Sequence, residues 1–341
     1  MALSIQEDFP LKQYNTFGVA ANARYFAEIN CEDDLYRLHA EHRDLLALPV
    51  LILGGGSNIL FTRDFEGLVI HMAIPGISHR IAGLTAEVTA GAGVVWNDLV
   101  WFCVDRQFGG IENLVLIPGT VGAAPVQNIG AYGVELQDVF YQCRAFDTQS
   151  GEIVRFSKTD CRFAYRDSLF KRQNGRYIIT QLSLKLSLRP ELNTTYGAIQ
   201  TELSNRHIAD PTLSDIAEAV SHIRTAKLPD PTTIGNAGSF FKNPIIPVQQ
   251  LSELQSAFPT LNFVSYPIDE NRVKIAGGWL IEQCGWKGKR IGDAGTWKNQ
   301  ALVLVNHHNA SGSEIYDLSA QIIDDVKSRF GITLEREVNI I

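Results

Sequence analysis

The chain contains 341 residues, of which 45% are hydrophobic and 20% charged, and its formal net charge is −7. This length exceeds one typical compact core, so we expect two or three domains. The composition excludes a disordered chain. The acidic balance argues against nucleic acid or an anionic membrane surface as a partner, because such partners attract basic proteins.

The sequence gives no sign of export, membrane insertion or metal binding. The N-terminal MALSIQEDFPLKQYNTFG lacks a basic start followed by an apolar run, and no apolar stretch reaches the roughly 18 residues of a membrane-spanning helix. The five cysteines are odd in number and form no CxxC pair, and the histidines show no zinc-binding spacing. We therefore expect a cytoplasmic protein with buried, reduced cysteines, no disulfide framework and no bound metal.

The N-terminal half shows the hydrophobic patterns of alternating strands and helices. Strands are expected over residues 23–29, 49–54, 67–72, 86–90, 139–147 and 177–187, and helices over residues 32–46 and 95–107. The run 49–54 is wholly apolar, which indicates a sheet that is covered on both faces. The pattern predicts an α+β fold in which strands predominate.

A change of organisation follows. A helix expected over residues 213–226 ends before LPDP at 228–231, where two prolines enforce an extended chain. From there a separate lobe is expected to run to about residue 330, with helices near 248–257 and 313–329. A final strand over 332–339 would close the chain.

The first candidate binding motif is LILGGGSNIL, residues 51–60. An apolar strand runs directly into Gly54, Gly55 and Gly56, and consecutive glycines let backbone N–H groups point into one concavity that suits a phosphate oxygen. A tight turn between strands is the alternative. The dinucleotide pattern GxGxxG fails here, because Ile59 stands at its third glycine, and the phosphate-binding GxxxxGK[ST] is absent, which argues against nicotinamide dehydrogenases and P-loop ATPases.

The second motif is GGIENLVLIPGTVGAAPVQNIGAYG, residues 109–133. Its six glycines and two prolines exclude a regular helix or a central strand, and its recurring Ile, Leu and Val exclude a solvated linker. We expect irregular backbone inside the protein, whose polar groups need partners. A large polar ligand would supply them, because small residues let main chain approach a pyrophosphate or a flat ring. A structural Ω-loop is the alternative.

The third motif is CRFAYRDSLFK, residues 161–171, in which Arg162, Arg166 and Lys171 accompany acidic residues and aromatic rings. A partly buried arginine beside a tyrosine can clamp a carboxylate. A surface patch of salt bridges explains the same composition.

Two further candidates carry hydroxyl and carboxyl groups. Ser239 lies in GNAGSFFKNP, where no GxSxG elbow indicates a hydrolase nucleophile, so it is either a hydroxyl donor in a dry site or a structural serine. In the terminal LEREVNII, Glu335 and Glu337 would face the same side of a strand. Periodicity does not choose between them, and solvated glutamates remain the alternative.

Six segments together resemble one family, the UDP-N-acetylenolpyruvoylglucosamine reductases of bacterial peptidoglycan synthesis. The segments occur in the family's order and span most of the chain: NTFG (15–18), LILGGGSN (51–58), IPGTVGAAPVQNIGAYG (117–133), YRDSLFK (165–171), TAKLPDP (225–231) and GNAGSFFKNP (235–244). The segment TTYGAIQ, with Tyr196, resembles the subgroup that carries a tyrosine-bearing loop.

The resemblance implies an FAD-binding fold of the vanillyl-alcohol-oxidase type. Residues 1–72 would form the first FAD-binding subdomain, and residues 73–207 with the C-terminal strand 331–341 the second, while residues 208–330 would form a substrate-binding domain. The cofactor would be FAD, with NADPH as co-substrate in the substrate cleft. The residues implied to bind FAD are Gly54, Gly55, Gly56, Ser57, Asn58, Pro118, Gly119, Gly122, Ala123, Asn128, Gly130, Ala131, Tyr132 and Tyr165.

The resemblance also implies a mechanism and its residues. Hydride would pass from flavin N5 to the enolpyruvyl CH2 of a UDP-sugar, and a serine would then protonate the adjacent carbon. The implied catalytic residues are Arg166, Ser239 and Glu337, and the implied substrate-binding residues are Tyr196, Lys227 and Asn243. Arg336 departs from the family pattern, because many relatives have proline there.

Two other classes remain as alternatives. One is another flavin oxidoreductase of the same fold, such as a sugar or alcohol oxidase, although the glycine loops contain no His or Cys for a covalent flavin bond. The other is a non-catalytic protein that binds nucleotide sugars. For the enzyme we expect small-molecule partners only and a monomer.

Overall fold

The computed structural model describes residues 3–341. The contacts within the chain group it into two compact units. The first unit comprises residues 1–9, 22–56 and 65–225, and the second comprises residues 10–21, 57–64 and 226–341. Over the described part of the chain, no helix combines the length and the apolar character needed to cross a membrane.

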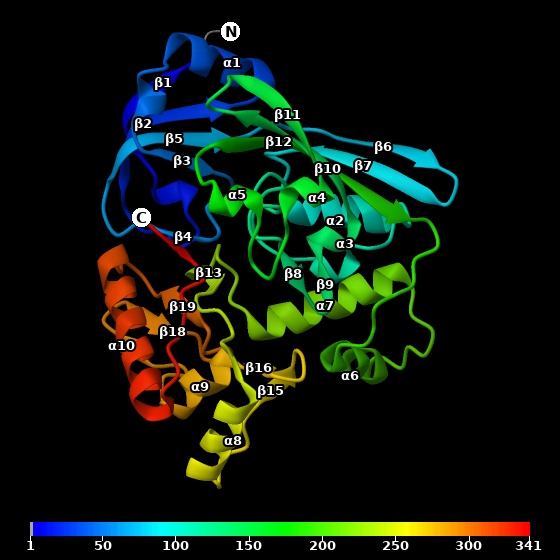
Figure 1. The fold of residues 1–341 in the computed structure, drawn as a ribbon, viewed down its shortest axis with the longest axis vertical. Helices are drawn as coiled ribbons and strands as arrows, with labels where there is room; N and C mark the ends of the chain where they lie inside the picture. Colours follow the sequence, from blue (N-terminus) through cyan, green and yellow to red (C-terminus); the bar gives the residue numbers. More distant parts are fainter. Residues whose placement is uncertain (1–2) are drawn as a thin grey trace. The chain divides into compact units, whose positions relative to one another are not determined.

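The first sheet of the first unit is four-stranded, in the order β1-β2-β5-β3 (Figure 1). Its strands are β1 (Ile5–Pro10), β2 (Asn22–Ile29), β5 (Phe65–Met72) and β3 (Val50–Leu53). The β2–β5 and β3–β5 pairs are parallel. β3 is an edge strand and its first three residues are only half-buried, so the expectation of full cover on both faces is met only in part.

Helix α1 (Glu32–Glu41) packs on this sheet through buried Leu35 and Leu38, with three acidic residues in its first turn. The helix predicted over 32–46 therefore ends early. Leu45 still reaches the same core, because a 3₁₀ turn, η2 (Leu45–Ala47), follows after a short break.

The second sheet of the first unit is antiparallel, in the order β11-β10-β12-β7-β6. Its strands are β6 (Ile77–Ala82), β7 (Thr85–Gly91), β10 (Phe140–Asp147), β11 (Glu152–Ser157) and β12 (Tyr177–Ser187). Figure 1 shows β6 and β7 continuing as a hairpin beyond the other strands. β1, β6 and β11 were not predicted, because their faces are largely exposed and lack clear apolar alternation.

Helices and small strands surround this second sheet. They are α2 (Trp96–Asp105), η3 (Glu112–Leu114), β8 (Gly130–Ala131), β9 (Val134–Glu135), α3 (Leu136–Val139), α4 (Lys158–Cys161), α5 (Leu169–Arg172), α6 (Gly197–Asn205) and α7 (Leu213–Lys227). Buried residues of α2, α6 and α7 share one hydrophobic core with the strands. The predicted helices 95–107 and 213–226 are confirmed, while α6 was not predicted.

The second unit contains three small sheets, in the orders β13-β19-β18-β17, β14-β16-β15 and β20-β4. The strands are β4 (Ile59–Leu60), β13 (Gly235–Ser239), β14 (Ile245–Pro247), β15 (Ser265–Pro267), β16 (Arg272–Ile275), β17 (Arg290–Ile291), β18 (Ala294–Thr296), β19 (Val303–Asn306) and β20 (Asn339–Ile340). The helices are α8 (Val248–Ala257), α9 (Gly277–Gln283) and α10 (Gly312–Phe330). The predicted helices 248–257 and 313–329 are confirmed.

The C-terminal segment differs from its prediction. Only β20 is a regular strand, and it pairs in parallel with β4 inside the second unit. Before β20 the chain forms an isolated bridge between Arg336 and Phe241 instead of the strand predicted over 332–339. The three-domain division stays a prediction.

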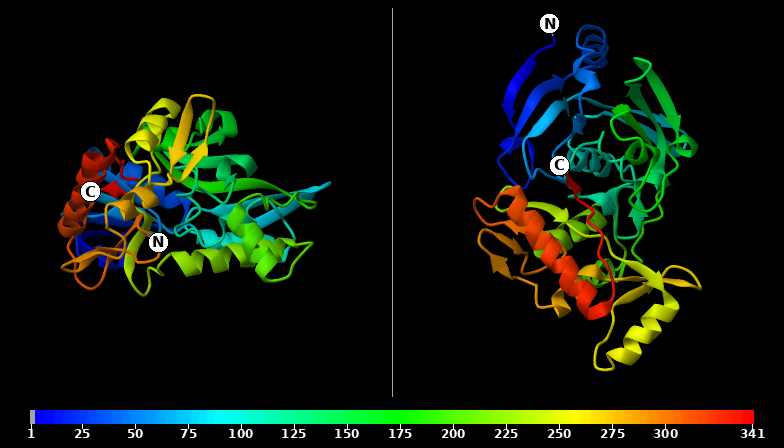
Figure 2. Two further views of the ribbon diagram at one scale, coloured as in Figure 1. Left: turned by 90° about the horizontal axis from the view of Figure 1, so that it is seen from below. Right: turned by 60° about the vertical axis from the view of Figure 1, so that its left-hand side comes forward.

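Helix α10 is well specified by its sequence. Ser311 and Glu314 form a capping box at its start, and Gly331 adopts the left-handed conformation at its end, with φ +67°. The right-hand view of Figure 2 shows the terminal segment running alongside this helix. Its first residue, Gly312, lies so close to the main chain of Phe61 that an added Cβ would be 1.7 Å from the Phe61 carbonyl oxygen.

We therefore predict that Gly312→Ala destabilises the protein by about 1–3 kcal/mol or more, because backbone cannot move aside cheaply. Gly197→Ala is the matched control, since Gly197 also begins a helix but has open space around it. That variant should be neutral or stabilising by about 0.4–1 kcal/mol. Urea unfolding of both variants measures the difference. Equal stability of the two would contradict the observed packing of α10 on Phe61.

Candidate active site

The two predicted ligand-binding segments of the first unit lie against each other. A Cβ added at Gly54 would be 2.4 Å from Thr120 Oγ1. A Cβ added at Gly55 would be 3.2 Å from the Cα of Gly119. The loop that follows β3 thus meets the segment 117–133 main chain to main chain, at a place where only glycine fits. We call this contact the glycine junction.

The segment 117–133 is irregular, as its composition predicted. Residues 115–129 form turns and bends, and main-chain hydrogen bonds tie them to the residues before and at the start of α2. Trp96 N donates to Gly119 O (3.0 Å), Val121 N to Val94 O (2.8 Å) and Gly122 N to Ala92 O (2.9 Å). The segment is therefore fixed by the protein.

The glycine junction also holds a polar group that needs a partner. Thr120 Oγ1 is buried, and within the described part of the chain it makes no hydrogen bond. Gly55, Pro118 and Ala123 remain exposed beside it. A buried hydroxyl without a partner is costly. A phosphate or ring oxygen of a bound cofactor would remove this cost, so the junction fits the diphosphate of a dinucleotide.

Arg166 is held in a strained and specific conformation. It is a non-glycine residue in the left-handed region, with φ +54°. Its Nη2 donates to Gly130 O (2.9 Å), and its own carbonyl accepts from Lys171 Nζ (3.1 Å). The guanidinium carbon lies 5.4 Å from the centre of the Tyr165 ring. The structure thus connects the motif of Arg166 to the segment 117–133.

Asn128 is a bridge between the same two motifs. Its side chain is buried, and Nδ2 donates to Glu135 Oε2 (2.9 Å) and to Ala164 O (3.2 Å). Its Oδ1 accepts from Gln137 N (3.0 Å). The amide is therefore engaged within the protein, and a contact between Asn128 and the cofactor stays a prediction.

A cluster around Tyr132 contains an arginine that the sequence analysis missed. The rings of Tyr132 and Tyr196 meet edge to face, with centres 5.1 Å apart. Burial raises the pKa of the Tyr132 hydroxyl, an effect that the neighbouring Arg224 opposes. Burial also lowers the pKa of the Arg224 guanidinium, while Arg166 adds to this effect by charge repulsion. Two arginines and two tyrosines therefore gather at one place, which suits an anionic ligand.

In the second unit, Ser239 lies near the terminal segment. Ser239 is the exposed last residue of β13, and Phe240 beside it accepts a hydrogen bond from Glu337 N (2.8 Å). Asn58 lies on the same segment, since its Nδ2 donates to Glu337 O (3.4 Å) and its carbonyl accepts from Asn339 N (3.1 Å). The predicted residues Asn58, Ser239 and Glu337 are thus brought together.

The structure distinguishes the two terminal glutamates. The Glu335 side chain is 71% exposed and forms an ion pair with Lys242. Glu337 is half-buried and held by its main chain between Phe240 and Asn58. The two glutamates therefore differ in exposure and contacts, and a catalytic role for Glu337 stays a prediction.

Arg336 attaches the terminal segment to α10. Its Nε donates to Ser319 Oγ (2.8 Å), and its guanidinium carbon lies 4.3 Å from the centre of the Tyr316 ring. Ser319 is fully buried. A hydrogen bond and a cation–π contact therefore hold the segment that carries Glu337.

The remaining predicted residues are distributed over both units. Lys227 is exposed at the end of α7, next to Ala226, whose carbonyl accepts from Asn299 Nδ2 (3.0 Å). Asn243 Oδ1 accepts from Gly277 N (2.8 Å) at the start of α9. Gly56 is buried with φ +61°, and Ser57 and Ala131 are half-buried. No described contact joins Lys227 to Asn243.

Comparison with known proteins defines the class. Residues 31–157 match the family described as FAD binding domain. Residues 230–341 match the family described as UDP-N-acetylenolpyruvoylglucosamine reductase, C-terminal domain. The α+β, FAD-binding fold predicted from the sequence is confirmed, and with it FAD as the cofactor: the chain is a flavin-dependent oxidoreductase.

Full-length relatives define the family. A UDP-N-acetylenolpyruvoylglucosamine reductase of Pseudomonas aeruginosa is 48% identical over 343 residues, covering 100% of both chains. One of Flavobacterium johnsoniae is 45% identical over 344 residues, covering 99% of this chain and 100% of the relative. The crystal structure of the Thermus caldophilus enzyme shares the fold, with a TM-score of 0.68, 24% identity and coverage of 100% of this chain and 99% of that chain. The chain belongs to the UDP-N-acetylenolpyruvoylglucosamine reductase family, as its motifs predicted.

We predict that Gly54→Ala weakens FAD affinity about tenfold or more, because the added methyl would fill the space beside the Thr120 hydroxyl. Titration of the FAD-free protein with FAD, followed by flavin fluorescence, measures the change. Gly197→Ala should retain normal affinity, since its methyl enters open space. Unchanged affinity in Gly54→Ala would place the cofactor elsewhere.

A second variant distinguishes a loss of FAD affinity from a loss of protein stability. Thr120→Val keeps the side-chain volume and removes the unpartnered hydroxyl. It should weaken FAD binding while leaving the FAD-free protein as stable as before, or more stable, because the buried hydroxyl of Thr120 that lacks a partner is then gone.

Proposed function

We propose that this protein reduces UDP-N-acetylglucosamine enolpyruvate to UDP-N-acetylmuramate, a step of peptidoglycan synthesis, with FAD as mediator and NADPH as the electron source. The observation that carries the proposal is the 48% identity over the whole length of the Pseudomonas aeruginosa reductase. Two features of the first unit support the proposal: the glycine junction fits the diphosphate of the cofactor, and the cluster of Arg166 and Arg224 suits an anionic ligand.

The chain's own residues supply binding and electrostatics. FAD, when bound, supplies the two-electron redox chemistry. The glycine junction would hold its diphosphate through main-chain groups and the Thr120 hydroxyl. Tyr165 and the backbone near Gly130 would border its ring system, because Arg166 ties both to one place.

Arg166 would stabilise the negative charge that develops on the substrate during the reaction. When a hydride adds to the terminal CH2, the electron pair of the double bond moves to the carbon that bears the ether oxygen, and the negative charge spreads into the adjacent carboxylate. A guanidinium fixed by Gly130 O is ready to stabilise this charge without reorganisation. Arg224 adds a second positive charge near Tyr132.

Ser239 and Glu337 would complete the reaction. The Ser239 hydroxyl would donate its proton to the carbanionic carbon, a transfer that a weak acid achieves only toward a strong base. Glu337 in its protonated form would donate a hydrogen bond to the developing charge, whereas an ionised carboxylate would repel it. The exposed position of Ser239 and its proximity to the Glu337 main chain support these roles.

In this proposal Tyr196, Lys227 and Asn243 recognise the substrate. The ammonium group of Lys227 and the polar groups of Tyr196 and Asn243 would bind the uridine diphosphate. The proposal includes a monomeric enzyme in the cytoplasm. Cys103, Cys143 and Cys161 are buried as expected, whereas Cys31 is exposed and Cys284 is half-buried. Burial raises the pKa of Cys103 to about 12 and keeps its thiol protonated.

We predict that Ser239→Ala leaves flavin reduction by NADPH intact but slows reoxidation by the enolpyruvyl substrate on the order of 10²- to 10⁴-fold, because only the second half-reaction needs the proton. Stopped-flow absorbance separates the two half-reactions. Glu337→Gln should show the same selectivity, while Glu335→Gln is the matched control and should retain both rates, since its side chain points to solvent and Lys242. Equal losses in both half-reactions would indicate a structural role for Ser239.

A further inference from the structure

The terminal segment that carries Glu337 has an arginine in a row of buried apolar residues. The other members of this row lie almost fully buried in the hydrophobic core of the second unit: Ile332, Leu334 and Val338. Residues 331, 333 and 335 between them are exposed. Because side chains alternate along an extended chain, Arg336 belongs to the inward row and Glu337 to the outward one. Packing alone would therefore favour an apolar residue at position 336.

The partners of Arg336 are uncharged. Its Nε donates to Ser319 Oγ (2.8 Å), and its guanidinium carbon lies 4.3 Å from the centre of the Tyr316 ring. Ser319 is fully buried, and its own hydroxyl donates to Tyr316 O (2.6 Å). A charge beside an apolar core loses hydration, and a neutral hydroxyl compensates this loss only in part. Stability therefore does not explain the arginine, and we call its contact with Ser319 and Tyr316 the helix anchor.

The helix anchor connects the terminal segment to an element that is itself fixed. Gly312, the first residue of α10, packs on the main chain of Phe61. The next residue, Ser313, donates from Oγ to Thr62 O (3.2 Å). A hydrogen bond from a planar guanidinium to one hydroxyl specifies both a distance and an angle, which an apolar side chain in the same space would not. The anchor therefore gives the terminal segment a defined direction relative to α10.

The main chain around Glu337 is held by separate contacts. Arg336 forms an isolated antiparallel bridge with Phe241, and Glu337 N donates to Phe240 O (2.8 Å). The carbonyl of Glu337 accepts from Asn58 Nδ2 (3.4 Å). An isolated bridge has no longer ladder to limit its rotation, so the helix anchor, one residue away, sets the orientation of Glu337.

We propose that Arg336 is a positioning residue for Glu337: through its contact with α10 it sets the direction in which the Glu337 carboxyl group leaves the terminal segment. The inference rests on the proposed role of Glu337 as a hydrogen-bond donor to the developing negative charge. A donor stabilises such a charge best when it is already aimed and needs no reorganisation. Because misplacement by about 1 Å can slow a reaction on the order of 100-fold, even a modest shift of this segment changes the rate.

The test measures the two half-reactions of the full-length, FAD-loaded enzyme by stopped-flow absorbance. Arg336→Met fills the same space but loses the hydrogen bond to Ser319. It should slow flavin reoxidation by UDP-N-acetylglucosamine enolpyruvate about 10-fold and leave flavin reduction by NADPH unchanged, because only reoxidation uses Glu337. The double variant with Glu337→Gln should reoxidise no more slowly than Glu337→Gln alone, since Arg336 acts through that carboxyl group.

Two further variants test the hydrogen bond itself. Ser319→Ala removes only its acceptor and should slow reoxidation with the same selectivity, so it decides the question if Arg336→Met does not fold. Arg336→Lys keeps a cationic donor on a long side chain and should recover most of the reoxidation rate that Arg336→Met loses.

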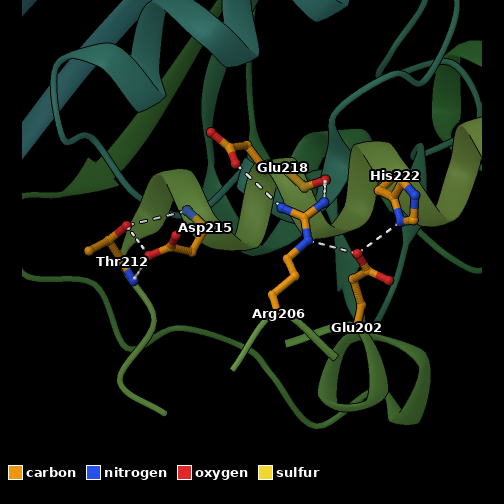
Figure 3. Close-up of polar contacts among 6 residues, drawn as sticks. All are labelled: Glu202, Arg206, Thr212, Asp215, Glu218 and His222. Carbon is orange, nitrogen blue, oxygen red and sulfur yellow. Dashed lines mark hydrogen bonds and ion pairs between the residues drawn. The ribbon is translucent and has the colours of Figure 1, made fainter. Parts of the chain in front are cut away.

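A control variant shows what reduced stability alone does to the half-reactions. Thr212 caps the start of α7, where its Oγ1 accepts from Asp215 N (3.3 Å), as Figure 3 shows. Because loss of such a cap destabilises a helix, Thr212→Ala should unfold at a lower urea concentration. Both of its half-reactions should keep their normal rates.

The outcomes separate this inference from the proposed function. Unchanged reoxidation in Glu337→Gln would remove the proposed role of Glu337 and the purpose of the helix anchor with it. If Glu337→Gln is slow, any of three results would overturn the inference alone and leave the role of Glu337 standing. These are a normal reoxidation rate in Arg336→Met, equal losses in both of its half-reactions, and effects that multiply in the double variant.

Discussion

The structure of the first unit depends on one close approach of main chain to main chain. Gly54 and Gly55 lie against Gly119 and Thr120 so tightly that a side chain at Gly54 would collide with the threonine hydroxyl. This approach creates a surface of exposed small residues with one buried, unpartnered hydroxyl. Such a surface fits the diphosphate of a dinucleotide, which agrees with the FAD-binding family that residues 31–157 match.

A second constraint is backbone strain around this surface. Leu116, Asn128, Tyr132 and Arg166 all have positive φ although none is glycine. Strain of this kind persists only where neighbouring contacts impose it, and it clusters at sites that need fixed geometry. Here the contacts come from side-chain amides and from the Arg166–Gly130 hydrogen bond, which hold the groups that we propose to bind the ligand.

Much of this could be predicted from the sequence, and the misses have physical reasons. The long apolar strands and helices and the irregular segment 117–133 were predicted because composition and periodicity are local signals. Arg224 was missed, because a single arginine on a helix has no pattern until the fold brings its partners close. Periodicity could not separate Glu335 from Glu337, since that choice depends on the contacts with Lys242 and Phe240.

The central claim is that the two small-residue segments hold a flavin whose reactive part remains open to substrate. The visible absorption spectrum of the purified protein tests this claim most directly. The account predicts a yellow protein with about one FAD per chain, released on denaturation, whose spectrum bleaches with NADPH and returns when the enolpyruvyl substrate is added. A colourless protein that takes up no FAD under any conditions of reconstitution would contradict it.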